Sequence, residues 1–243
     1  MVLKPVDHLS ELSELLNYTS IMFFEEPHEE WYAKDADWTP AGLKLFKNES
    51  TVPQEILQKP LRIWKGYDQI IVSRTFIESI FEKLNLEVIM NLFDQRKFYG
   101  VDEMLLQTLY RNYLGLEGQP TSSCNNLVPD TIERWTDWIY RGTDGEFHPN
   151  CKSKFERHWI CIMGVEYLKD FTETSYVIGN KFLENYDVGP VVCLKELFQL
   201  NKIKKRITRM ELQNYPQFRE MEMKHFGTYD KNSFKCDNDR NLT

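Results

Sequence analysis

Residues 99–109 read Tyr-Gly-Val-Asp-Glu-Met-Leu-Leu-Gln-Thr-Leu, with two adjacent acids on a short turn before an apolar run of helical spacing. We expect Asp102 to cap this helix, whose dipole favours both negative charges. A carboxylate held there is oriented and ionised, as a general base must be. Because acidic residues are common in the first turn of any helix, the stretch alone favours an ordinary surface helix. The rest of the chain decides whether Glu103 has a role in catalysis.

The composition is that of a folded, acidic protein. The chain has 243 residues, of which 42% are hydrophobic, and it includes six Trp and fifteen Phe, which argues against disorder. Its net charge of −7 gives no reason to expect a nucleic-acid partner, and we interpret the basic cluster at 202–206 as a solvated helix face. No apolar run has the length of a membrane span, and the first residues lack the apolar region of a signal peptide. These features alone indicate a cytosolic protein.

Two features disagree with a cytosolic location. Three Asn-x-Ser/Thr patterns, at Asn17, Asn48 and Asn241, are acceptor motifs for N-glycosylation. Five cysteines include one close pair that suits a small disulfide loop, and the odd count leaves at least one thiol unpaired within the chain. A secreted domain that lacks its N-terminal part has both features.

The hydrophobic periodicity predicts helices that alternate with a few short strands, which is typical of an α/β protein. Ser73 is expected to cap the second helix. The predicted helices cover residues 8–16, 75–84, 86–93, 102–113, 166–176 and 190–205, and the predicted strands cover 64–72 and 159–164. Residues 131–140 are expected to form a strand or an extended segment.

Five segments in a fixed order carry a family resemblance. Residues 66–74 look like a Gly-Ser-Ala-Tyr-Phe-Val-Val-Ser-Arg segment, and 99–109 are similar to Tyr-Ser-Pro-Asp-Glu-x-x-x-Ala-Thr-Leu. Residues 138–140 match Trp-x-Tyr, 151–164 match a Cys, an Arg six residues later and then Cys-Ile-x-Gly, and 180–182 match Asn-Lys-Phe. In this order they resemble the core-2/I-branching β-1,6-N-acetylglucosaminyltransferase family, glycosyltransferase family 14.

The resemblance runs from about residue 3 to about residue 205 and covers the C-terminal half of that family's catalytic domain. It implies an α/β fold of the GT-A-like glycosyltransferase type without the N-terminal nucleotide-binding half. We expect a partial catalytic domain over 1–226 and a polar C-terminal tail over 227–243. The start at Leu3-Lys4-Pro5, in the middle of a family motif, leads us to expect a fragment that is inactive alone.

The resemblance implies that Glu103 is the catalytic base of an inverting transfer, with Asp102 as a cap or orienting group. Gly100-Val101 stands where the family has Ser-Pro, which changes the turn but keeps both acids. Arg157 and Lys181 fall on the pair of cations that contact the UDP diphosphate, so no metal cofactor is expected. Arg157 matches the family when counted from Cys151, and His158 takes its place when the count starts from Cys161.

Several further residues take their roles from the same resemblance. Trp138 and Tyr140 fall on an acceptor-binding Trp-x-Tyr, although two core aromatics would look the same in the sequence. Glu30 and Lys34 lie in the acceptor-contacting loop, where the match is poor. The resemblance also implies a short-loop disulfide between two cysteines and an N-terminal partner for a third, and these are Cys151, Cys161 and Cys193.

The implied activity is transfer of N-acetylglucosamine from UDP-N-acetylglucosamine to a 6-hydroxyl of a galactose or N-acetylgalactosamine acceptor, as in O-glycan branching. The implied location is the lumenal side of the Golgi membrane, through an N-terminal anchor that this chain lacks. A related transferase that uses another donor, such as UDP-xylose, stays open. So does a non-catalytic or zinc-binding interaction module, because His148, Cys151, His158 and Cys161 have the ligand types for zinc, though in an uncommon spacing.

Overall fold

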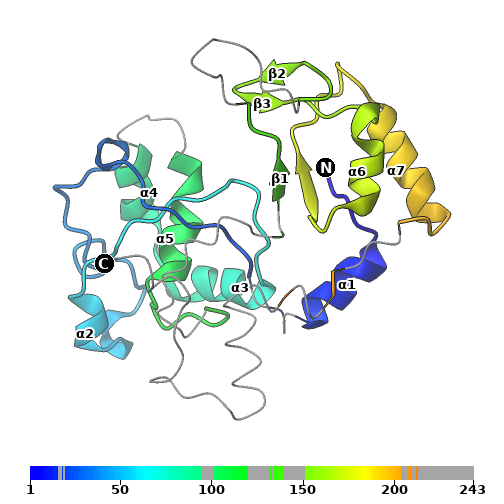
Figure 1. Ribbon diagram of the computed structural model, residues 1–243. Helices are drawn as coiled ribbons and strands as arrows, with labels where there is room; N and C mark the ends of the chain where they lie inside the picture. The colour runs from blue at the N-terminus through cyan, green and yellow to red at the C-terminus, as the bar shows by residue number, and fades with distance from the viewer. Residues whose placement is uncertain are drawn as a thin grey trace, which may run out of the picture. The chain divides into compact units, whose positions relative to one another are not determined.

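The computed structural model describes residues 1–15, 18, 20–94, 101–119, 132, 134–139, 151–203, 207–208 and 212. They form two compact units. Unit 1 holds the described residues within 1–15 and 131–212, and unit 2 holds those within 16–130. Helices and short strands occur together, which is compatible with the expected α/β class (Figure 1). The predicted tail at 227–243 lies outside the described residues.

Unit 2 is built from helices around one apolar core. Ser73 caps α3 as predicted, since its hydroxyl accepts from the Phe76 amide at 3.2 Å. The core includes fully buried Leu43, Ile89 and Leu109, which bring the helices together. The helices of this unit are α2 (Gln54–Leu57), α3 (Arg74–Lys83), α4 (Glu87–Asp94) and α5 (Leu105–Arg111), with the 3₁₀ turns η1 (Glu29–Trp31), η2 (Glu49–Thr51) and η3 (Val101–Glu103).

Two predictions within unit 2 are wrong. Asp102 does not cap α5, because the chain first makes the 3₁₀ turn η3 and the helix begins two residues after it, at Leu105, with Met104 at the N-cap. Residues 64–72 form no strand, and only Lys65 and Ile71 make isolated bridges to a neighbouring segment. The ladder fails because the chain bends between these two positions, and the Gly66 amide instead donates to the Glu103 carbonyl at 2.9 Å.

Unit 1 contains a small parallel sheet and three helices. Strand β1 (Arg134–Thr136) pairs in parallel with β4 (Ile178–Asn180), and Val2 bridges to Ile178 in the antiparallel direction. Helices α6 and α7 lie side by side in Figure 1. The helical elements of the unit are α1 (Val6–Leu15), η4 (Val165–Tyr167), α6 (Leu168–Glu173) and α7 (Gly189–Gln199).

A tight hairpin replaces the buried strand predicted at 159–164. Strands β2 (Glu156–Arg157) and β3 (Ile160–Cys161) are antiparallel and joined by His158 and Trp159. Both turn residues have positive φ, 54° and 64°, as a two-residue hairpin turn of the type I′ class requires. Trp159 is therefore 52% exposed at the tip of the hairpin rather than buried within a strand.

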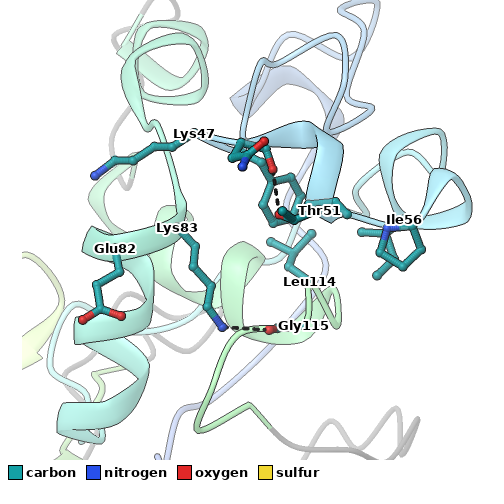
Figure 2. A pocket seen from close by; sticks show the side chains of 11 residues that line it. Lys47, Thr51, Ile56, Glu82, Lys83, Leu114 and Gly115 are labelled. Atoms are coloured by element: carbon teal, nitrogen blue, oxygen red, sulfur yellow. Dashed lines mark hydrogen bonds between the residues drawn. The ribbon is translucent and has the colours of Figure 1, made fainter.

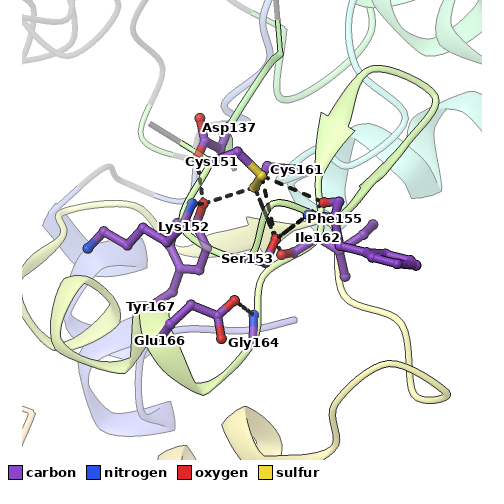
Figure 3. The surroundings of a disulfide bond; sticks show 10 residues. All are labelled: Asp137, Cys151, Lys152, Ser153, Phe155, Cys161, Ile162, Gly164, Glu166 and Tyr167. Carbon is purple, nitrogen blue, oxygen red and sulfur yellow. Dashed lines mark hydrogen bonds between the residues drawn. A yellow bond between two sulfur atoms is a disulfide. The ribbon is translucent and has the colours of Figure 1, made fainter. Parts of the chain in front are cut away.

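A disulfide joins Cys151 to Cys161, the pair that the family resemblance suggested (Figure 3). The Tyr167 hydroxyl lies 3.0 Å from the Cys161 sulfur and donates to an Asp137 carboxylate oxygen at 2.7 Å. Burial and this hydrogen bond raise the pKa of Tyr167 well above that of an ordinary tyrosine. The disulfide thus anchors the hairpin against η4 and the segment that follows β1.

None of the described helices combines the length and the apolar character that crossing a membrane requires.

Candidate functional site

Glu103 ends the turn η3 in unit 2, and its backbone is tied to the segment around Gly66. The Glu103 carbonyl accepts from the Gly66 amide at 2.9 Å. A Cβ at Gly66 would lie only 2.1 Å from the Phe23 carbonyl oxygen, so this position has room for glycine alone. The adjacent Tyr67 stacks on Phe23 with ring centroids 4.7 Å apart, and its carbonyl accepts from Gln107 at 2.7 Å. The turn that carries Glu103 is therefore held by the Gly66 amide, and the helix after it is held by the bond from Gln107 to Tyr67.

Lys65 bridges two carboxylates in unit 2. Its ammonium lies 3.0 Å from the Glu103 Oε2 and 2.8 Å from the Glu25 Oε1. The backbones of Lys65 and Glu25 exchange two hydrogen bonds, at 2.7 and 2.9 Å, which hold the two residues side by side. The ammonium also lies 5.5 Å from the centre of the Trp31 ring, a cation–π distance. Lys65 thus orients one oxygen of the Glu103 carboxylate.

Burial changes the titration of this pair. The Glu103 side chain is 19% exposed, and desolvation raises its pKa, although Lys65 acts in the opposite direction. Burial lowers the pKa of Lys65, but hydrogen bonds and charges from Glu25 and Glu103 outweigh it, so this pKa is raised. A carboxylate with a raised pKa is a stronger base than an ordinary glutamate, provided that the pH keeps it ionised.

The predicted acceptor loop is exposed and meets this cluster through Trp31. Lys34 pairs with Glu29 at 3.1 Å, and both side chains are largely exposed. Glu30 is exposed on the turn η1. The Trp31 ring thus places the loop next to Lys65. The Lys34 ammonium pairs with Glu29 within the loop itself.

Three predicted site residues lie in unit 1, on backbone segments that hydrogen-bond to their neighbours. Trp138 is 37% exposed and bridges to Ile160, which pairs with Arg157 on the other side of the hairpin. Arg157 is exposed on β2, whereas His158 is in the turn. Lys181 follows β4 and is half-buried, and its carbonyl accepts from the Met163 amide at 2.8 Å. Glu103 belongs to unit 2, whereas Arg157 and Lys181 belong to unit 1.

The metal alternative depends partly on residues that are not described. Tyr140 and His148 both lie outside the described residues. Cys151 and Cys161 share a disulfide, so neither is a thiolate that could bind zinc. Among the described residues, no three His, Cys, Asp or Glu side chains are grouped as a metal site.

Sequence reasoning missed Lys65 and its partner Glu25. No sequence signal singled out Lys65, because the run 61–72 holds two further charges, Arg62 and Asp68. Glu25 had no signal either, since it lies in an acidic segment with several equivalent carboxylates.

The family model for the Core-2/I-Branching enzyme matches residues 1–172. The match covers the Glu103 turn, the Gly66 segment, Trp138 and Arg157, and it ends before Lys181. No curated protein matches the chain.

Proposed function

The chain belongs to the Core-2/I-Branching enzyme family of glycosyltransferases, and from this premise we propose that it transfers N-acetylglucosamine from UDP-N-acetylglucosamine to a 6-hydroxyl of a galactose or N-acetylgalactosamine acceptor. The observation that carries the proposal is the Glu103 carboxylate, which is buried enough to have a raised pKa and is oriented by Lys65 at 3.0 Å. A base of this kind typically accelerates a reaction about 10²–10⁴-fold.

In the proposed step, Glu103 accepts the proton of the acceptor 6-hydroxyl. The hydroxyl oxygen forms a bond to the anomeric carbon of the donor, and the bond from that carbon to the diphosphate breaks. UDP leaves with the electron pair, and attack from the opposite face inverts the anomeric centre. Lys65 supports this role, since it binds the Glu103 Oε2 and leaves the other oxygen for the proton.

Arg157 and Lys181 are proposed to bind the diphosphate as it gains charge, in place of a metal ion. Two cations aimed at the leaving group stabilise the transition state, and Arg does so with two parallel hydrogen bonds. The exposure of Arg157 and the half-buried position of Lys181 are compatible with contact to a ligand. The proposal therefore predicts activity in the presence of a chelator.

We propose that the acceptor contacts are those that the family resemblance implies, at Trp138, Tyr140, Glu30 and Lys34. Trp138 is partly exposed, and Glu30 and Lys34 are exposed, so these three side chains are accessible to a sugar. The indole ring offers a flat apolar surface to one face of a sugar ring, and the charged pair offers partners to its hydroxyls.

We place the protein on the lumenal side of the Golgi membrane. The Cys151–Cys161 disulfide supports this location, because disulfides persist in oxidising compartments.

The test is a donor screen with the enzyme expressed from its complete coding region. UDP-N-acetylglucosamine and UDP-xylose are offered with galactose- and N-acetylgalactosamine-terminated acceptors, with and without EDTA, and products are identified by mass and linkage analysis. We expect a β-1,6-linked N-acetylglucosamine product in both conditions. A xylose product would refute the donor assignment, and loss of activity with EDTA would refute the metal-free mechanism.

A further inference from the structure

The sequence motif at Asn48 has a defined conformation in unit 2. Asn48-Glu49-Ser50 is an acceptor motif without proline in the middle, and it leads into the 3₁₀ turn η2. The Asn48 side-chain oxygen accepts from the Ser50 amide at 3.2 Å and from the Ser50 hydroxyl at 2.7 Å. The Ser50 hydroxyl and the Asn48 side-chain amide, which define the motif, are therefore in direct contact.

This contact leaves the side-chain nitrogen of Asn48 available. Asn48 is exposed, and within the described part of the chain its Nδ2 has no hydrogen-bond partner. The carbonyl group of the same residue is held by the Thr51 hydroxyl at 2.9 Å. The oxygen side of Asn48 is thus fixed by its own turn, whereas the nitrogen is open to reaction.

A hollow of about 320 Å³ lies beside Asn48 (Figure 2). Its apolar part is formed by Val52, Ile56 and Leu114, and the Lys83 ammonium reaches across it toward the Gly115 carbonyl at 3.4 Å. A sugar has an apolar ring face and polar hydroxyls at its edge, so this mixed lining suits one sugar ring. Of the residues that carry the proposed base, Glu103, Lys65 and Glu25, none lines the hollow.

We propose that Asn48 carries an N-linked glycan and that the first N-acetylglucosamine of this glycan lies over the hollow. The donor is an oligosaccharide linked to a lipid pyrophosphate, and a separate glycosylation enzyme catalyses the reaction. The Asn48 nitrogen loses a proton and bonds to the anomeric carbon, while the bond from that carbon to the pyrophosphate breaks and the lipid pyrophosphate leaves with the electron pair. The proposal rests on the lumenal location argued above.

The first experiment maps glycans on the protein secreted from a eukaryotic host. A peptide amidase that removes N-glycans in H₂¹⁸O converts a glycosylated Asn into ¹⁸O-labelled Asp, which peptide mass spectrometry locates. We expect the label at Asn48, loss of one glycan in Ser50→Ala, and retention in Ser50→Thr. Asn85 is a matched internal control, since its side chain accepts from the Glu87 amide at 3.2 Å in a similar turn but lacks the hydroxyl residue.

An unmodified Asn48 overturns the proposal, whether or not Asn17 and Asn241 are modified. Measuring the transfer activity of Asn48→Gln distinguishes a failure of this proposal from a failure of the proposed function. The variant is expected to keep full transfer activity. The second experiment trims the glycan to one sugar and records NOEs between its protons and the Ile56 methyl groups. Contacts are expected, and their absence in the trimmed glycoprotein overturns the placement of the sugar over the hollow.

Discussion

Gly66→Ala tests whether the segment around Gly66 holds the proposed base in place. The added Cβ would lie 2.1 Å from the Phe23 carbonyl oxygen and 2.9 Å from the Gln107 Cγ. An ordinary carbon–oxygen contact is about 3.3 Å or longer, so the two backbone segments must separate by about 1.2 Å. Because the Gly66 amide donates to the Glu103 carbonyl at 2.9 Å, this shift moves the turn that carries the base.

Gly66→Ala is expected to lower both the stability of the protein and the rate of sugar transfer. Overpacking of this kind typically costs ~1–3 kcal/mol, which lowers Tm by about 2–12 °C for a protein of this size. Misplacing a catalytic group by ~1 Å lowers the rate by about 10²-fold. Differential scanning calorimetry measures the first effect, and kcat/KM for sugar transfer measures the second.

Gly115→Ala is the matched control for this experiment. Gly115 has a positive φ of 70° but no atom within 4 Å of an added Cβ. The variant should lose ~1–2 kcal/mol of stability through backbone strain alone and keep its transfer rate. If Gly66→Ala retains both wild-type Tm and wild-type kcat/KM, the reasoning about this contact is refuted.

Three further predictions concern the charges, the disulfide and the acceptor. Lys65→Met removes the cation that favours the Glu103 carboxylate, so the pKa of Glu103 rises further. In the kcat/KM profile, the loss of activity on acidification should therefore begin at a higher pH. An unchanged profile would exclude a role for Lys65 in stabilising the ionised carboxylate. Cys151→Ser should lower the free energy of unfolding by ~2–4 kcal/mol in denaturant titrations, and an unchanged midpoint would mean that the disulfide does not stabilise the hairpin. Trp138→Ala should raise KM for the acceptor while KM for the donor stays constant, and equal effects on both would contradict an acceptor-side position.

The sequence was most informative where one local rule decides the structure. Ser73 follows an apolar segment and precedes a periodic one, and capping chemistry alone places α3. The helices predicted at 75–84 and 86–93 correspond closely to α3 and α4. In these elements, local preference and tertiary packing agree.

The failures occurred where a distant contact overrides the local pattern. The run 64–72 was predicted as a strand, but the bond from Gly66 to the Glu103 carbonyl and the bend that follows prevent a ladder. Trp159 looks like the first residue of a buried strand, yet it forms the turn of a hairpin. No pattern in a single sequence reveals that Glu25 meets Lys65, because that contact joins residues 40 positions apart.

Replacing Glu103 by Gln tests the central claim most directly. In the enzyme expressed from its complete coding region, transfer from UDP-N-acetylglucosamine should fall about 10²–10⁴-fold, because the amide cannot accept the acceptor proton. UDP affinity should not change, and Glu55→Gln, at an exposed position in unit 2, should behave as the wild type. Wild-type turnover in Glu103→Gln would contradict the assignment of Glu103 as the catalytic base.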